Sequence, residues 1–142
     1  MPQFVADFIP DGLDDFTSGY LQCAEFTNPA DELLAPAEGE ESTEVESEML
    51  EIIGWSPESI ATAKSDCAKF QADNAALLES YYEESGRTEE SAGNDFWYSR
   101  NGHGAGFFDR GKAPCFDALQ DAARKWSDVD VYVSDVGHLE LS

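Results

Sequence analysis

Residues 94–111, NDFWYSRNGHGAGFFDRG, constrain the fold of this chain more than any other stretch. They bring five aromatic residues, four glycines and two arginines together within eighteen positions. The Asn101-Gly102 pair is the strongest short-range signal for a two-residue type I′ hairpin turn, because both central residues of that turn need a positive φ. The sequence therefore predicts two antiparallel strands on either side of Asn101-Gly102.

In the predicted hairpin, two residues that face each other across the strands lie at equal distances along the chain from the Asn101-Gly102 turn. Trp97 then faces Gly106, where the indole ring would fill the space left by the missing side chain, and Phe96 faces Phe107. Successive side chains of a strand point to opposite faces, so aromatic residues fall on both faces of this hairpin. We therefore expect the hairpin to be covered on both sides or to expose an apolar patch.

The residues after the hairpin predict one helix and two more strands. Pro114 suits the first position of a helix that ends near Ser127. Valine alternates with polar residues over residues 129–133, as in a half-buried strand, and residues 138–141 form a last strand after a turn. Residues 94–142 are thus predicted to form a ββαββ unit, a small antiparallel sheet with one crossing helix.

Helices are expected in the first half of the chain. Apolar residues recur every three or four positions over residues 11–27, which predicts an amphipathic helix. A longer helix is expected over residues 57–84, between an N-cap at Ser56 and a stop at Gly86. Its apolar stripe contains one polar residue, Asn74, which either bonds locally or sets the register of a helical partner.

The chain length of 142 residues favours a single domain over residues 1–142, long enough to bury about two thirds of its surface. The predicted fold class is α+β, with a helical, acidic part over residues 1–93 packed on the ββαββ unit of residues 94–142. No apolar run has the length of a membrane span, so membrane insertion and secretion are not expected. Three cysteines without a C-x-x-C pair argue against a disulfide framework and favour a reducing cytosol.

The formal net charge is −22, and most of it lies in the first two thirds of the chain. Residues 1–95 contain 23 Asp and Glu against 3 Lys and Arg, whereas residues 96–142 contain 7 against 5. Such a field repels DNA, RNA and anionic membranes and attracts basic partners, so direct nucleic-acid or membrane binding is not expected. Seven carboxylates form the candidate binding surface: Glu38, Glu40, Glu41, Glu44, Glu46, Glu48 and Glu51.

Most of these carboxylates lie in residues 28–48, which also contain Pro29, Pro36 and Gly39. This composition is typical of a solvated linker, and a strip of fixed negative charge is the functional alternative.

Arg100, His103 and Arg110 form an alternative candidate, a ligand site in the predicted hairpin. Between two glycines, His103 has the setting of a general base beside N–H groups that could hold an anion. At the rise of a strand, Asp95 and Asp109 lie on the order of 15 Å from the turn, so neither can orient His103. We therefore assign no catalytic residue.

Thiol and metal chemistry have weak support. Cys67 lies on the apolar stripe of the second helix, where a cysteine is most simply a small buried residue. Cys115 lies at a helix N-terminus, where the pKa of a thiol can fall, so reactivity there stays open. His103 and His138 are 35 positions apart and give no metal-ligand spacing, so we expect no metal and no cofactor.

The stretch that predicts the hairpin also resembles the signature of a family of small, uncharacterised bacteriophage and prophage proteins. In that family the signature is followed, as here, by a short helix and a terminal hairpin. The resemblance covers residues 57–142 and implies a phage setting and a host cytoplasm, but no reaction. It rests on Asp95-Phe96-Trp97, Arg100-Asn101-Gly102-His103-Gly104, Gly106-Phe107 and Asp109-Arg110-Gly111.

The expected function is that of a non-enzymatic phage accessory protein that binds a basic protein surface. Its specific form is a DNA-mimicking inhibitor of a host or defence nucleic-acid-binding protein, acting as a monomer or homodimer in the host cytoplasm. Two alternatives stay open. One is a small enzyme or anion-binding domain centred on Arg100, His103 and Arg110, and the other is a virion or assembly component that oligomerises through the long helix.

Overall fold

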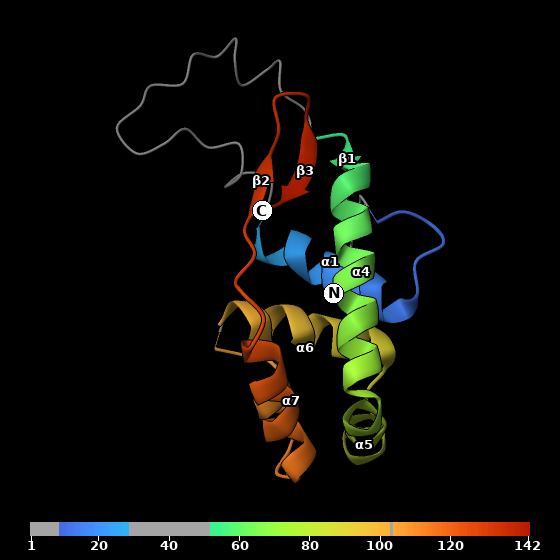
Figure 1. The fold of residues 1–142 in the computed structure, drawn as a ribbon, viewed down its shortest axis with the longest axis vertical. Helices are drawn as coiled ribbons and strands as arrows, with labels where there is room; N and C mark the ends of the chain where they lie inside the picture. The colour runs from blue at the N-terminus through green and yellow to red at the C-terminus, as the bar shows by residue number, and fades with distance from the viewer. Residues whose placement is uncertain (1–8, 29–51, 103) are drawn as a thin grey trace, which may run out of the picture.

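The computed structural model describes residues 9–28, 52–102 and 104–142. The protein is mostly helical, with a small three-stranded mixed sheet at one end of the molecule (Figure 1). The elements in chain order are α1 (Asp15–Thr27), β1 (Gly54–Trp55), α4 (Pro57–Asp73), α5 (Ala75–Ser85), α6 (Glu89–Asn101), the 3-10 turn η1 (Phe107–Asp109), α7 (Pro114–Arg124), β2 (Val131–Val133) and β3 (His138–Leu141).

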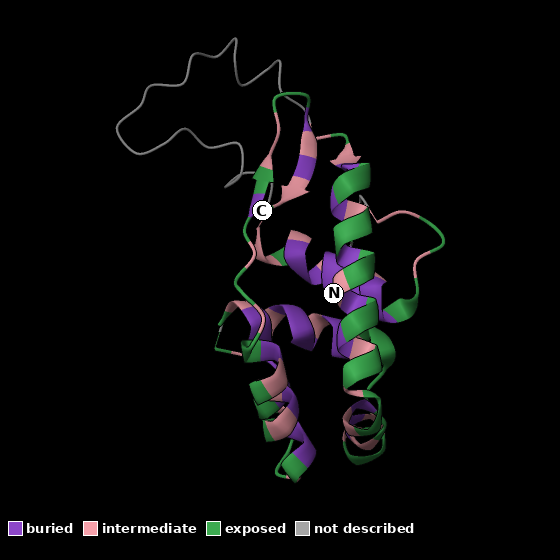
Figure 2. Ribbon diagram, in the orientation of Figure 1, coloured by how far each residue is buried: buried purple, intermediate pink, exposed green. Residues whose placement is uncertain are grey.

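Helices α1 and α6 form the most extensive helix pair among the described elements. They approach so closely that a Cβ added at Gly93 of α6 would overlap the carbonyl oxygen of Phe16. On the other side of the contact, a Cβ added at Gly19 of α1 would overlap the carbonyl oxygen of Glu90. Figure 2 shows both helices as largely buried, in contrast to the green outer faces of α4 and α7. The glycine pair is therefore what allows the central two helices to pack backbone against backbone.

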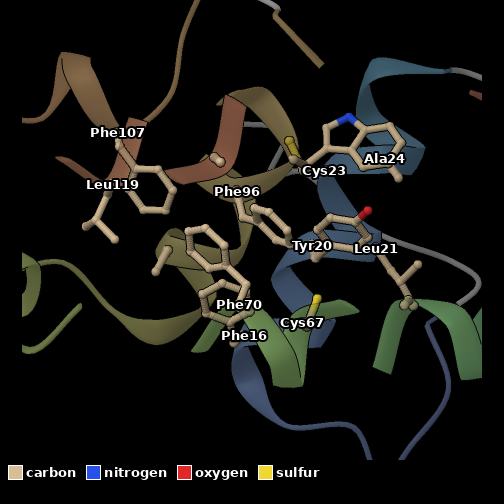
Figure 3. Close-up of a cluster of buried hydrophobic side chains, with 14 of the residues drawn as sticks. Phe16, Tyr20, Leu21, Cys23, Ala24, Cys67, Phe70, Phe96, Phe107 and Leu119 are labelled. Carbon is tan, nitrogen blue, oxygen red and sulfur yellow. The ribbon is translucent and has the colours of Figure 1, made fainter. Parts of the chain in front are cut away.

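Aromatic side chains from α1, α4 and α6 fill the core around this helix pair (Figure 3). The rings of Phe70 and Phe96 stack with their centroids 4.1 Å apart. Trp97 packs edge-on against Tyr20 of α1, with ring centroids 5.2 Å apart, and its indole N–H donates to the Thr27 hydroxyl at 2.9 Å. The predicted pairing of Trp97 with Gly106 is therefore wrong, because Trp97 points into a helical core.

The hairpin predicted for residues 94–111 does not form. Residues Glu89–Asn101 belong to α6, which ends at Gly102 with φ of 65° and ψ of 41°. The Gly102 N–H donates to the carbonyls of Ser99 and Tyr98 and so satisfies the helix end. A left-handed glycine ends a helix as readily as it turns a hairpin, because both need a positive φ. A helix and a 3-10 turn therefore replace the first two strands of the predicted ββαββ unit.

The last two predicted strands are confirmed, but the sheet they belong to is mixed. Strands β2 and β3 are antiparallel, and β3 pairs on its other side with the parallel strand β1. Because β1 precedes α4, the sheet joins the two halves of the chain. Its buried face carries Trp55, Val131 and Leu139. The hydroxyls of Ser56 and Ser59 both donate to the Glu140 carboxylate, which fastens β3 to the start of α4.

The predicted helices over residues 11–27 and after Pro114 are confirmed. The helix predicted over residues 57–84 is helical but divided at Asn74, where φ of −124° and ψ of 25° separate α4 from α5. The Asn74 side chain donates to the Phe70 carbonyl at 2.9 Å, so this residue bonds locally and ends α4. In the described ranges, no helix has the length and apolar content needed to cross a membrane.

Candidate functional site

The predicted acidic surface and the predicted histidine cannot be placed. Glu38, Glu40, Glu41, Glu44, Glu46, Glu48, Glu51 and His103 all lie outside the described residues. The site is therefore built from the carboxylates, arginines and cysteines that the structure does describe.

Arg110 of the predicted ligand site is held by a buried aspartate. Its guanidinium makes a two-pronged ion pair with Asp95, with Nε–Oδ2 at 2.9 Å and Nη2–Oδ1 at 2.5 Å. Asp95 is fully buried in α6 and also accepts the Tyr81 hydroxyl at 2.7 Å. The Asp95 hydrogen bond raises the pKa of Arg110 against the opposing effect of burial. Burial first, and then the Asp95 charge, raise the pKa of Tyr81, so the phenol stays a donor to the carboxylate.

Arg100 is held separately, near the C-terminal end of α6. Its Nη1 donates to Asp66 at 2.9 Å and to the Tyr20 hydroxyl at 3.1 Å, and its Nε donates to the Ser127 carbonyl at 2.7 Å. The guanidinium also lies 5.1 Å from the centre of the Trp126 ring. Arg100 is only 5% exposed, so its bonds tie α1, α4 and the end of α7 to α6. The structure therefore gives Arg100 and Arg110 different protein partners and describes no ligand site that the two share.

The cysteines are buried thiols with no disulfide among them. Burial raises the pKa of Cys23 to about 12 and also raises that of Cys67. The pKa of Cys115 is raised by burial and by the nearby Glu84 charge, although the thiol lies at the start of α7. Loss of solvation therefore outweighs the backbone N–H groups of the helix N-terminus, and the pKa of this thiol lies above its ordinary value. Among the described residues no group of His, Cys, Asp and Glu could hold a metal ion.

The glycines of the predicted hairpin are structural in the positions that are described. A Cβ at Gly106 would overlap the Ser99 hydroxyl, which accepts the Phe107 N–H at 3.1 Å and donates to Gln120 at 2.6 Å. A Cβ at Gly102 would lie 3.0 Å from the Arg124 guanidinium, which donates to the last carbonyls of α6. These contacts account for the glycines through packing and helix capping.

The described surface is strongly acidic even without the predicted tract. Sixteen Asp and Glu side chains are exposed, against six Lys and Arg side chains. Helix α5 carries Glu79 and Glu83, and α7, which packs against it, carries Asp117 and Asp121. Residues four apart on a helix are separated by about 6 Å along its axis. We call these four residues the α5/α7 carboxylates.

The α5/α7 carboxylates were not among the predicted site residues, because the acidic tract before residue 52 is denser in the sequence. A signal for them was present in the sequence, since Glu79 and Glu83, and likewise Asp117 and Asp121, repeat at a helical spacing. What the sequence could not provide was the packing of α5 against α7, which brings the two pairs onto neighbouring helices.

Comparisons with protein-family models, with curated proteins and with solved structures found no match to this chain.

Proposed function

We propose that this protein is a non-enzymatic binding protein that engages a basic surface of another protein. Its specific form is a DNA mimic, which inhibits a nucleic-acid-binding protein of the host or of a defence system. The observation that carries the proposal is the excess of exposed carboxylates on folded elements, where their positions are fixed by helices. A phage origin fits this proposal through the resemblance of residues 95–111.

The spacing of the α5/α7 carboxylates supports the DNA-mimic form. The two carboxylates of each pair are about 6 Å apart along the helix axis, which is close to twice the axial spacing of phosphates on one DNA strand. One DNA strand carries one phosphate per about 3.4 Å of helix axis. A basic groove that binds phosphates would therefore meet, on each helix, carboxylates at about the spacing of every second phosphate.

The placement of Glu79 and Glu83 on α5 is unfavourable for stability, which argues that they serve something other than folding, whereas Asp117 lies in the favourable first turn of α7. Like charges four residues apart on a helix destabilise it by about 0.2 to 0.5 kcal/mol per pair. Glu83 and Glu84 also lie in the last turn of α5, which contains no basic residue, at the negative end of the helix dipole. The same holds for Asp73 at the end of α4. A surface selected only for stability would carry Lys or Arg at these positions.

The test is capture of a partner from bacterial lysate by the immobilised full-length protein and by two variants of equal charge. The first variant neutralises the α5/α7 carboxylates, as Glu79→Gln, Glu83→Gln, Asp117→Asn and Asp121→Asn. The control neutralises four exposed aspartates elsewhere, as Asp11→Asn, Asp128→Asn, Asp130→Asn and Asp135→Asn.

The wild-type protein should retain a nucleic-acid-binding protein at low salt and release it as salt screens the contact. The α5/α7 variant should retain much less of it than the control variant, while melting at the same temperature or slightly higher. Recovery of no nucleic-acid-binding protein at any salt concentration would contradict the proposal. Equal retention by the two variants would move the contact away from α5 and α7.

A further inference from the structure

A cleft of about 360 Å³ lies where the C-terminal ends of α4 and α7 meet. This volume is within the range of about 300 to 1,000 Å³ that small-molecule sites occupy. None of the side chains around the cleft belongs to the α5/α7 carboxylates, so the cleft is independent of the proposed protein-binding surface. The residues that line it are Lys69, Asp73, Asn74, Ala122, Lys125 and Trp126.

The cleft is lined by more basic than acidic side chains, whereas the rest of the described surface is acidic. Lys69 from α4 and Lys125 from the end of α7 line it together, although they are far apart in the sequence. Behind it, the Arg100 guanidinium lies against the Trp126 ring, and Arg124 donates to the Arg100 carbonyl at 3.0 Å. Arg100 is paired with Asp66, and Arg124 lies 3.9 Å from Asp128, so Lys69 and Lys125 are the two basic residues that line the cleft itself.

The single acidic residue of the lining does not neutralise this charge. Asp73 pairs with Lys69 at 2.8 Å, but both side chains are more than half exposed, at 55% and 67%. Exposed pairs of this kind are weak because water screens them and both side chains are flexible. No ion pair is present at Lys125 in the part of the chain that the structure describes.

Hydrogen-bond donors outnumber acceptors in the cleft. Both lysine ammonium groups are donors, and the Asn74 amide uses one of its two N–H groups on the Phe70 carbonyl. The Trp126 indole N–H has no hydrogen-bond partner among the described residues, whereas Trp55 donates to Glu25 and Trp97 donates to Thr27. Compensation of the helix dipole explains basic residues at the end of α7. It does not extend to Lys69 of α4, which lines the same cleft as Lys125.

We propose that this cleft binds a small organic anion that contains an aromatic ring, such as a nucleoside monophosphate. The ring lies against the Trp126 indole, and the anionic group lies between the ammonium groups of Lys69 and Lys125. The net charge of the protein repels long polyanions, but charges more than about 8 Å away are largely screened at physiological salt. A small anion can therefore reach a local basic site.

The test follows the three tryptophan indole N–H signals of the labelled full-length protein by NMR during titration. The probes are adenosine 5′-monophosphate, benzoate, adenosine and inorganic phosphate. Adenosine monophosphate should shift the Trp126 signal and leave the hydrogen-bonded Trp55 and Trp97 signals in place. Benzoate, which has a smaller ring, should shift the same Trp126 signal but bind more weakly than adenosine monophosphate. Adenosine and phosphate should bind more weakly than adenosine monophosphate, because each offers only one of the two recognised groups.

Four variants test the assignment. Lys69→Gln and Lys125→Gln should each weaken binding of adenosine monophosphate by about two- to five-fold, as expected for one solvent-exposed charge contact. Asp73→Asn should tighten it, because Lys69 is released from its carboxylate partner. Arg87→Gln is the control, since it removes the same charge from an exposed position outside the cleft.

Three outcomes would overturn the proposal. The first is an unmoved Trp126 signal with adenosine monophosphate at about 10 mM, where even a millimolar site is mostly filled. The second is equal binding of adenosine or of phosphate alone, since the cleft would then not recognise the combination. The third is an equal loss of affinity in Arg87→Gln and Lys125→Gln, because the effect would then come from net charge. Unchanged circular dichroism of each variant excludes unfolding as the cause of lost binding.

Discussion

Replacement of Gly93 by alanine tests the central helix contact, because it should reverse the usual sign of a glycine-to-alanine change in a helix. Inside an exposed helix, alanine is more favourable than glycine by about 0.8 to 1.0 kcal/mol. In α6, the new methyl group would overlap the carbonyl oxygen of Phe16 in the backbone of α1. No side-chain rotation can relieve a clash with backbone, so α1 and α6 must separate.

The expected loss in the free energy of unfolding follows from the gain in helix propensity and the opposing cost of the backbone clash. Overpacking a tight core costs about 1 to 3 kcal/mol and occasionally more, and a backbone clash belongs at the upper end. After the gain in helix propensity, we expect Gly93→Ala to lower the free energy of unfolding by about 2 kcal/mol. Gly19→Ala should do the same. The double variant should cost less than the sum of the two, because one separation of the helices relieves both clashes.

Urea unfolding followed by circular dichroism gives the free energy of unfolding of each variant. Ala68→Gly, on the exposed face of α4, is the matched control and should cost about 0.5 to 1 kcal/mol through helix propensity alone. A Gly93→Ala protein as stable as the wild type, or more stable, would refute the close contact between α1 and α6.

Three further outcomes are expected. Asp95→Asn should lower the free energy of unfolding in urea by about 2 to 4 kcal/mol. This is somewhat less than for a fully buried ion pair, because the Arg110 side chain is 19% exposed. The control Asp109→Asn, at an exposed position, should change the free energy of unfolding little. Hydrogen bonds from Ser56 and Ser59 lower the pKa of Glu140 from its ordinary value of 4.5. The ionised carboxylate therefore stabilises the fold fully at pH values above 4.5. This stabilisation is lost as the pH falls through the lowered pKa of the folded protein. The stability difference between the wild type and Ser59→Ala should therefore be full at neutral pH and shrink in acid; a pH-independent difference would exclude this coupling. The three cysteine thiols, which are buried, should react with a thiol reagent at mildly alkaline pH only as fast as the protein unfolds, and a fast reaction in the native state would contradict their burial.

The parts of the fold that the sequence predicted correctly are those with local signals. Ser56 followed by Pro57 begins α4, and Gly86 with φ of 69° follows the end of α5. The alternation of valines predicted β2, and the strand after its turn is β3. Each of these signals depends on residues within a few positions of one another, so no distant partner is needed to interpret them.

The hairpin prediction failed because its strongest signal, Asn-Gly, is compatible with a helix end as well as with a hairpin turn. Asn101-Gly102 needs a positive φ at glycine, and that requirement is met at a helix end as well as in a turn. Helix α6 is also buried on several sides, with Phe96, Trp97 and Arg100 all inside, so it lacks the polar face that reveals a helical period. The close approach of α6 to α1 at Gly93 is a further determinant that local patterns do not show, because Phe16 lies more than seventy positions earlier in the sequence.

The surroundings of the two arginines of the predicted ligand site also depend on distant residues. The partners of Arg100 and Arg110, which are Asp66 and Asp95, become their neighbours only in the folded chain. The acidic character was visible in the composition, whereas its arrangement on α5 and α7 depends on the packing of those helices. Composition therefore predicted the sign of the charge and not its position.

The measurement that most directly tests the proposed function is competition between this protein and double-stranded DNA for the partner that it captures. A carboxylate surface that replaces a phosphate backbone should displace labelled DNA completely and with one-to-one stoichiometry. The affinity of the protein for its partner should fall steeply as salt rises, and neutralising the α5/α7 carboxylates should flatten that dependence. A stable complex in which the partner holds DNA and this protein at the same time would contradict the DNA-mimic proposal.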